Sequence, residues 1–241
     1  LRVSGGTPGT EIVLRYGERL DESGELDQTL IAPFIKSGEC QTDRYIMKGE
    51  GEEIWEPRFT YHGFRYIQVE GLPGAATRDH IRGRVVRTAF DEIGSFECSS
   101  VDVNELQQAT KWSYIGNFVG IPTDCPHREK NGWTGDAQLA AETGLLNYDS
   151  AGSYMQWLDT MADVQRPSGQ LPGIVPSCGW GYNWGSGPAW DAAFVLMPWY
   201  IYLYTGDVGA IEKQYDGIRR YVDFCGTMAT GGFSTSQASV G

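Results

Sequence analysis

In residues 1–97, polar and apolar side chains alternate with a period close to two, which is the spacing of a half-buried β-strand. The alternation occurs at 11–16, 43–48, 64–69 and 84–90, and turn sequences rich in Gly and Pro separate these segments. It indicates about five or six short strands. We therefore expect residues 1–97 to form a partial antiparallel β-sandwich.

From residue 98 onward, the apolar residues recur at helical spacing instead. Ser99 and Ser100 are suitable N-terminal capping residues for a first helix that reaches Ile115. Further helices are expected at 135–147, 151–164, 189–204 and 208–228. The change of period divides the chain into domains 1–97 and 98–241, and it predicts an α+β multidomain protein.

The tryptophans gather in the helical half, since only Trp55 of the eight precedes it. Trp112, Trp157 and Trp199 fall on apolar helical stripes, so we expect them in the core. The remaining four lie in or beside loops: Trp133, Trp180, Trp184 and Trp190. Because an indole face stacks well on the apolar C–H side of a sugar ring, sugar binding is the favoured use of these four.

The formal net charge of −12 disfavours a nucleic-acid or anionic-membrane partner, because phosphate groups bind basic surfaces. No apolar run approaches the roughly 18 residues of a membrane-spanning helix. The five cysteines form no Cys-x-x-Cys pair and only three histidines are present, so a zinc site is not expected. Scattered cysteines in odd number favour a reducing compartment such as the cytoplasm.

The densest group of chemically active side chains is Pro-Thr-Asp-Cys-Pro-His-Arg-Glu-Lys-Asn-Gly-Trp-Thr-Gly-Asp, which ends at Asp136. It places Asp124, Arg128 and Glu129 shortly before Trp133. Carboxylates and a guanidinium hydrogen-bond sugar hydroxyls, and an indole stacks on the ring. A carboxyl beside an aromatic face can have a raised pKa and serve as a general acid. The run therefore predicts a site that binds a sugar and protonates a glycosidic oxygen.

Structural roles are open for the same residues. Asp124 precedes Cys125 and a proline, a position suited to capping a turn. Asp136 stands at the start of a predicted helix, where a carboxylate can cap the N-terminus. Glu129 could belong to an ordinary surface ion-pair cluster with Arg128 and Lys130. Arg128 could instead be the partner of Asp124 or Asp136 and hold the loop. Cys125 is expected to be a buried small residue rather than a nucleophile, because no suitable His–Asn arrangement accompanies it.

Residues outside this run are expected to be structural. His62 should be satisfied within the sheet domain, and the acidic residues at 50–56 should form a solvated turn. His127 is expected at the rim of the site or behind it. Glu142 is left out of the site, because six residues turn a helix by about 600° and place it opposite Asp136.

Several motifs resemble the bacterial α-L-rhamnosidase family of inverting glycoside hydrolases, over essentially the whole chain. The most specific are Asn-Phe-Val-Gly-Ile-Pro-Thr-Asp-Cys-Pro at 117–126 and Gly-Trp-Thr-Gly-Asp-Ala-Gln at 132–138. The segment at 52–66 resembles the end of the β-domain that precedes the catalytic barrel in that family. The segments at 188–193 and 205–207 resemble parts that line the same cleft.

The resemblance implies that residues 98–241 form the N-terminal part of an (α/α)6 barrel and that Glu129 is the general acid. It assigns rhamnose binding to Asp124, Arg128, Trp133, Asp136, Trp190 and Asp191. The implied reaction is hydrolysis of terminal α-L-rhamnosyl residues with inversion, without a metal or organic cofactor. The implied partner is a rhamnose-containing oligosaccharide or glycoside.

Two departures from the family pattern affect this interpretation. Many members carry one more residue between the Arg and the Gly-Trp, with two consecutive acids, whereas only Glu129 is present here. Inversion also needs a second carboxylate about 6.5–9.5 Å away, which in the family lies far downstream. We therefore expect these 241 residues to lack the general base and to hydrolyse nothing alone. The alternatives are a catalytically silent carbohydrate-binding protein and an inverting glycosidase of different sugar specificity on the same barrel.

Overall fold

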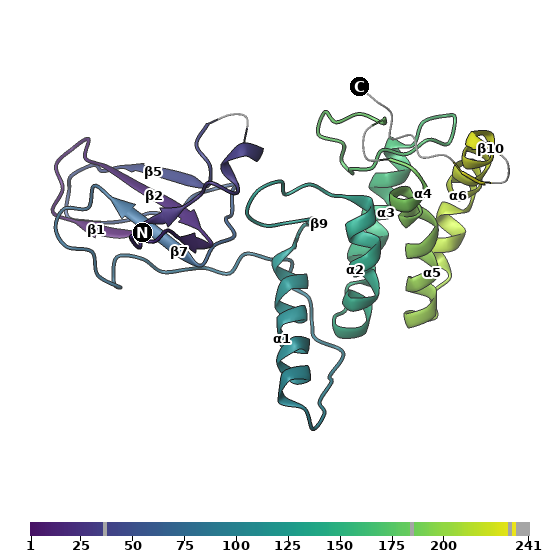
Figure 1. The fold of residues 1–241 in the computed structure, drawn as a ribbon, viewed down its shortest axis with the longest axis horizontal. Helices are drawn as coiled ribbons and strands as arrows, with labels where there is room; N and C mark the ends of the chain where they lie inside the picture. The colour runs from purple at the N-terminus through teal and green to yellow at the C-terminus, as the bar shows by residue number, and fades with distance from the viewer. Residues whose placement is uncertain (36–37, 184–185, 231–232, 235–241) are drawn as a thin grey trace. The chain divides into compact units, whose positions relative to one another are not determined.

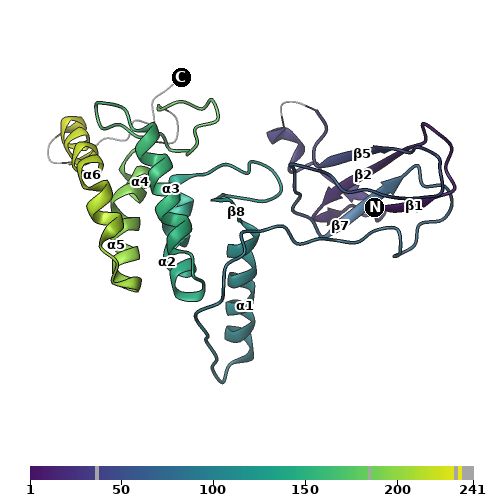
Figure 2. The same ribbon diagram turned by 180° about the vertical axis from the view of Figure 1, so that it is seen from behind.

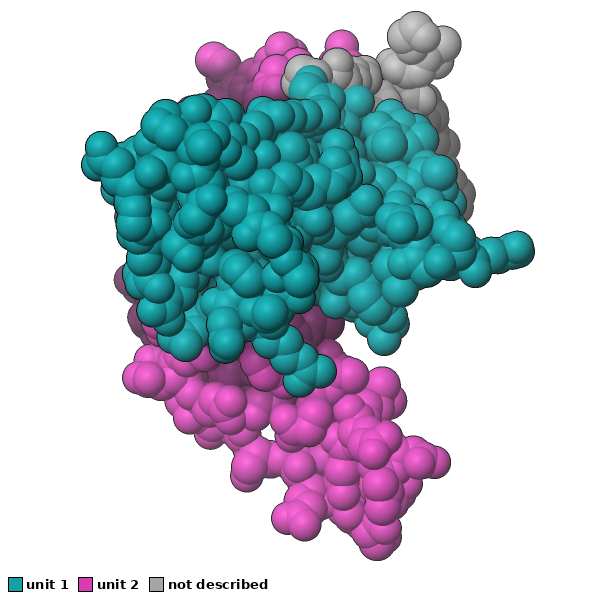
Figure 3. Space-filling view, turned by 90° about the vertical axis from the view of Figure 1, so that its left-hand side faces the viewer, with its two compact units in different colours: residues 1–86, 125–130 teal, residues 87–124, 131–241 magenta. Residues whose placement is uncertain are grey.

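The computed structural model describes residues 1–35, 38–183, 186–230 and 233–234. The chain forms two compact units, which Figure 3 colours separately. Unit 1 consists of residues 1–86 and 125–130, and unit 2 of residues 87–124 and 131–241. The domain boundary between residues 97 and 98 stays a prediction. Hydrophobic periodicity cannot show that a short later segment, 125–130, packs with the first part of the chain.

Unit 1 is built around a three-stranded antiparallel sheet in the order β5-β2-β7 (Figure 1). Its strands are β2 (Glu11–Gly17), β5 (Thr42–Ile46) and β7 (Tyr66–Glu70). The other elements are β1 (Arg2–Ser4) paired with β6 (Glu52–Ile54), β3 (Arg19–Leu20) paired with β4 (Leu26–Asp27), and a 3-10 turn at Ala32–Phe34. Val3, Ile12 and Met47 form the small core of the unit.

The predicted strands at 11–16, 43–48 and 64–69 are confirmed within a residue or two. The strand predicted at 84–90 is wrong: Val85 and Val86 are exposed where the chain leaves unit 1, so no sheet face receives them. The solvated turn predicted at 50–56 is also wrong, because β6 lies there. The buried Glu53 carboxylate accepts the Tyr45 hydroxyl and the backbone N–H groups of Lys48 and Gly49.

Unit 2 contains six helices in the described part of the chain: α1 (Val101–Gly116), α2 (Thr134–Asn147), α3 (Ala151–Val164), α4 (Pro188–Asp191), α5 (Ala193–Thr205) and α6 (Gly209–Met228). Helix α2 packs against α1, α4 and α5, and α3 packs against α5 and α6 (Figures 1 and 2). Two short antiparallel pairs complete the unit: β8 (Phe118–Val119) with β9 (Ile121–Pro122), and β10 (Ala229–Thr230) with β11 (Phe233–Ser234).

The helices expected from periodicity are confirmed, except that the one predicted at 189–204 is divided into α4 and α5 at Ala192. Ser100 occupies the predicted N-cap position of α1, although its side chain makes no capping hydrogen bond. None of the helices in the described ranges is long and apolar enough to cross a membrane.

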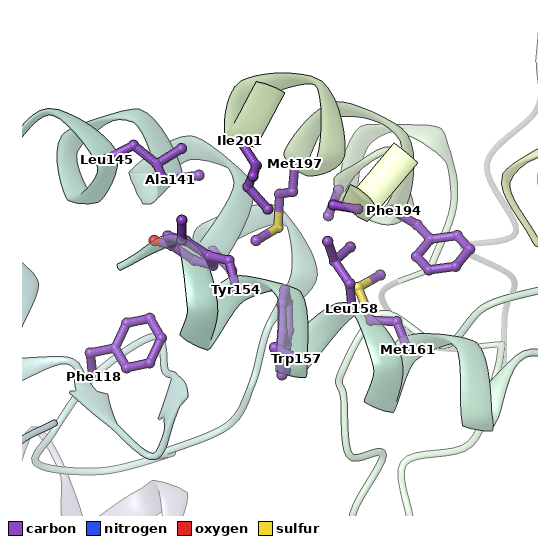
Figure 4. Close-up of a cluster of buried hydrophobic side chains, with 14 of the residues drawn as sticks. Phe118, Ala141, Leu145, Tyr154, Trp157, Leu158, Met161, Phe194, Met197 and Ile201 are labelled. Carbon is purple, nitrogen blue, oxygen red and sulfur yellow. The ribbon is translucent and has the colours of Figure 1, made fainter. Parts of the chain in front are cut away.

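The core of unit 2 lies between α3 and its neighbours (Figure 4). Tyr154, Trp157 and Leu158 of α3 pack with Met197 and Ile201 of α5. The Trp157 indole N–H donates to the Val175 carbonyl at 3.0 Å, so this ring is both buried and satisfied. Full burial of each such side chain stabilises the fold by about 1.5–3 kcal/mol.

Two of the three predicted core tryptophans are not in this core. Trp157 is 1% exposed, as expected, but Trp112 is 61% and Trp199 is 47% exposed. Their helices bury other faces, through Tyr114 in α1 and Met197 in α5. A hydrophobic stripe gives the face that a helix can bury, whereas the position of neighbouring elements decides which residues are covered.

Candidate active site

Asp124 closes the base of the segment that carries the predicted acid. It follows the β8–β9 hairpin, and its Oδ1 accepts the Asn131 backbone N–H at 2.9 Å. Its own backbone N–H donates to the Asn131 carbonyl at 3.1 Å. These two bonds join the ends of segment 125–130, so the turn-capping role anticipated for Asp124 is confirmed.

Segment 125–130, hereafter the acid loop, belongs to unit 1. Its Cys125 is buried, as predicted, and the Cys125 Sγ accepts the backbone N–H of Glu129 at 3.3 Å. Arg128 and Glu129 are half-buried. The His127 Nε2 lies 3.7 Å from the Glu18 carboxylate, so a protonated His127 forms an ion pair there.

Trp133 and Asp136 lie at the beginning of α2 in unit 2. Trp133 occupies the N-cap position in extended conformation and pairs with Ile174 in an antiparallel bridge. Asp136 is exposed in the first turn of α2, so it lies at the helix start as predicted, although Trp133 occupies the N-cap position. A carboxylate in this turn interacts favourably with the helix dipole. The sequence thus presents a half-buried indole and an exposed carboxylate at one helix end.

Trp190 comes to the same helix end from α4. A Cβ atom built on Gly135 would lie 2.9 Å from the Cδ1, Cδ2 and Cε2 atoms of the Trp190 indole. The ring therefore rests on the backbone of Gly135, immediately before Asp136, and only a glycine permits this approach. Trp190 is 41% exposed, which leaves much of its ring accessible.

Asp191 differs from the other predicted ligands because it is only 3% exposed. Its Oδ2 accepts the Gly187 backbone N–H at 2.7 Å, and its buried Oδ1 has no hydrogen-bond partner among the described residues. Burial raises the pKa of Asp191 to about 7, although the bond from Gly187 opposes this shift. The backbone N–H groups of Trp190 and Asp191 both donate to the Gly187 carbonyl, so Asp191 closes the turn that presents Trp190.

The predicted site residues are therefore distributed over both units. Unit 2 carries the ligand candidates Trp133, Asp136 and Trp190 at one helix end, and unit 1 carries Arg128 and Glu129 in the acid loop. Trp180 is 43% exposed, and Trp184 lies outside the described residues. The residues described contain no group of three or more His, Cys, Asp or Glu side chains that could hold a metal ion.

Sequence reasoning missed the residues that place these side chains. Asn131, Gly135 and Gly187 act through backbone groups or through the lack of a side chain. The glycines beside Trp133 and Trp190 were the available signal, since glycine often marks a close approach.

A β unit followed by a helical unit is the fold class of the six-hairpin glycosidases, and two family models match the chain to it. Residues 91–239 match the bacterial α-L-rhamnosidase 6 hairpin glycosidase domain, and residues 1–87 match the bacterial α-L-rhamnosidase concanavalin-like domain. The chain belongs to the bacterial α-L-rhamnosidase family.

Individual relatives agree with this assignment. An α-L-rhamnosidase of Formosa agariphila is 36% identical over 217 residues, which cover 89% of this chain and 23% of that protein. The structure of the α-L-rhamnosidase from Dictyoglumus thermophilum is similar with a TM-score of 0.87 and 39% identity, over 95% of this chain and 25% of that one. The Streptomyces avermitilis α-L-rhamnosidase, solved in complex with L-rhamnose, gives a TM-score of 0.86 and 34% identity, over 96% and 22%. The chain thus spans about a quarter of the length of these relatives.

Proposed function

We propose that this chain contributes the acid side of an α-L-rhamnosidase site, which hydrolyses terminal α-L-rhamnosyl residues with inversion. The observation that carries the proposal is the helix end at which the accessible Trp190 indole lies on Gly135, directly before the exposed Asp136. An aromatic face beside a carboxylate suits a sugar ring, which has an apolar C–H side and hydroxyl donors. The similarity to an enzyme solved with L-rhamnose supports rhamnose as that sugar.

In this proposal Trp133, Asp136 and Trp190 contact the rhamnose ring from unit 2. In this proposal the Asp124 carboxylate accepts a sugar hydroxyl, from the position that its bond with the Asn131 backbone N–H fixes. Arg128 donates to hydroxyls from the acid loop. The sequence predicts direct contact between Asp191 and the sugar. Its burial supports an indirect role, through the turn that presents Trp190.

Glu129 is the general acid in this proposal. Its protonated carboxyl donates to the departing glycosidic oxygen, while a water activated by a second carboxylate attacks the anomeric carbon from the opposite face. Such proton transfer typically accelerates a reaction by about 10²–10⁴-fold. We place the second carboxylate outside residues 1–241, in keeping with the share of the relatives' length that this chain covers.

The test is Glu129→Gln in the complete enzyme, assayed on an alkyl rhamnoside and on a 4-nitrophenyl rhamnoside. We expect kcat to fall by about 10²-fold or more on the alkyl substrate and much less on the nitrophenyl one, whose leaving group needs little protonation. Glu142→Gln is the matched control, because Glu142 is an exposed carboxylate of α2 that accepts the Tyr204 hydroxyl. Equal losses on both substrates would show that Glu129 binds or orients instead. Rhamnose binding without turnover of either substrate by the unmodified protein would favour a carbohydrate-binding role.

A further inference from the structure

Besides the contact of His127 with Glu18, the acid loop packs against the short segment Tyr61–His62–Gly63 of the β unit. A Cβ atom built on Gly63 would lie 2.9 Å from the Pro126 Cγ and 3.1 Å from both the Cβ and the backbone nitrogen of His127. Gly63 has no left-handed backbone conformation that would itself require glycine. Its lack of a side chain is therefore explained by the loop that rests on it.

Gly63 is held in place by a buried glutamine. The Gln41 side-chain amide donates to the Gly63 carbonyl at 2.8 Å, and the Gly63 backbone N–H donates to the Gln41 Oε1 at 3.2 Å. Gln41 is 6% exposed and immediately precedes β5. Both backbone groups of Gly63 are thus fixed to the central sheet by one side chain.

The neighbouring His62 is fixed to the same sheet. Its Nε2 lies 3.0 Å from the Asp43 Oδ2, which also accepts the Tyr16 hydroxyl at 2.9 Å. The His62 and Tyr16 rings stack with centroids 4.2 Å apart. Burial raises the pKa of Asp43, but the bonds from His62 and Tyr16 outweigh burial and leave it lowered, so this carboxylate stays ionised near neutral pH. The prediction that His62 is satisfied in the sheet domain holds for its Nε2 only, because the buried Nδ1 has no hydrogen-bond partner among the described residues.

The end of the acid loop also meets this segment. The Lys130 Nζ lies 5.5 Å from the centre of the Tyr61 ring, within the range of a cation–π contact. Lys130 directly follows Glu129 and has a left-handed φ of 55°, a conformation that costs a non-glycine residue about 1–2 kcal/mol. Surrounding contacts must hold such a residue in place.

From these contacts we infer that Tyr61–His62–Gly63 is a positioning element for the acid loop, with Gly63 as its supporting surface and Gln41 as its anchor. The inference rests on the proposed role of Glu129. None of these residues touches substrate; they fix the backbone from which the Glu129 carboxyl extends. The β unit thereby contributes to the proton-transfer step, in addition to any contribution to stability.

The experiment compares Gly63→Ala with Gly83→Ala in the complete enzyme. Gly83 lies in the same unit, has no left-handed φ and has no atom within 4 Å of a built Cβ, so it controls for the substitution itself. Because misplacement of a catalytic group by about 1 Å can cost about 10²-fold, we expect Gly63→Ala to lower kcat by about 10–100-fold on an alkyl rhamnoside. The loss on a 4-nitrophenyl rhamnoside should be only a few-fold, and Gly83→Ala should match the unmodified enzyme on both substrates.

Gln41→Ala is the second variant, because it removes the anchor without adding an atom near the loop. It should show the same preference for the activated substrate as Gly63→Ala. Amide hydrogen exchange over residues 125–130 gives a readout independent of catalysis, and it should be faster in both variants than in Gly83→Ala.

The outcomes separate the two proposals. In one outcome, Glu129→Gln loses more activity on the alkyl than on the nitrophenyl substrate, whereas Gly63→Ala and Gln41→Ala lose activity equally on both substrates or not at all. This outcome overturns the positioning role and leaves the general-acid role in place. If Glu129→Gln does not discriminate, the proposed function fails. Unchanged hydrogen exchange of the acid loop in both variants overturns the positioning role in either case.

Discussion

The buried carboxyl of Asp191 should make the stability of unit 2 depend on pH. Burial raises the pKa of this group from 3.8 to about 7 in the folded protein. Between these two pH values the folded state therefore holds a proton that the unfolded state has released. The free energy of unfolding must fall as pH rises through this window, at up to about 1.4 kcal/mol per pH unit. Over the whole window the loss is about 4 kcal/mol.

Two titratable groups of α6 also interact with Asp191, and neither interferes in this window. Burial raises the pKa of the Tyr221 hydroxyl and of the Cys225 thiol, and the Asp191 charge adds to both shifts. Both groups therefore stay neutral between pH 4 and 8. The pH dependence in this cluster is assigned to Asp191 alone.

The perturbation is Asp191→Asn, which keeps an acceptor for the Gly187 N–H and removes the ionisation. Urea unfolding of the unmodified protein and the variant, measured from pH 4 to 8, gives the difference in unfolding free energy at each pH. This difference should shift by about 4 kcal/mol in favour of the variant as pH rises. Asp216→Asn, at an exposed position of α6, should give no comparable shift. Parallel pH curves for Asp191→Asn and the unmodified protein would refute the reasoning.

Two further predictions concern residues assigned to sugar binding, Trp190 and Asp124. Gly135→Ala must displace the Trp190 indole, so we expect KM for rhamnosides to rise about fivefold, corresponding to about 1 kcal/mol of lost ring contact. Gly152→Ala is the control, because Gly152 is the second residue of α3, as Gly135 is of α2, and has open space around a built Cβ. It should leave KM unchanged and stabilise the fold by about 0.4–1 kcal/mol. A similar KM in both variants would contradict the role of Trp190. Asp124→Ala should speed hydrogen exchange at the Asn131 amide and destabilise the protein by about 0.5–1.5 kcal/mol. Asp124→Asn keeps the acceptor for this amide, so it should raise KM while the exchange of the Asn131 amide stays slow. Equal kinetics for the unmodified protein and Asp124→Asn would limit Asp124 to closing the loop.

The sequence by itself determined which segments form helices and strands and which chemically active side chains lie near one another along the chain. Helix α3 begins and ends where its periodicity predicts, because the repeat of 3.6 residues is a local property of the chain. The same holds for the bounds of β2, Glu11–Gly17, although Ile12, Val13 and Leu14 are all buried and burial does not alternate along this strand. Several segments together indicated the family, and the most specific of them, at 117–126 and 132–138, lie close together in the sequence.

Tertiary structure alone decided which of these residues are exposed and what holds them. Sequence reasoning placed the Asp191 carboxylate against a ligand and the Glu53 carboxylate in solvent. Both carboxylates are instead buried and bound to backbone N–H groups. Trp112 has a core-like position in its helical pattern but is exposed, because covering a face depends on the path of other segments. The packing of the acid loop on Gly63 joins residues far apart in the sequence. Such contacts depend on the path of the whole chain in the folded state. A local pattern of polar and apolar residues does not determine that path.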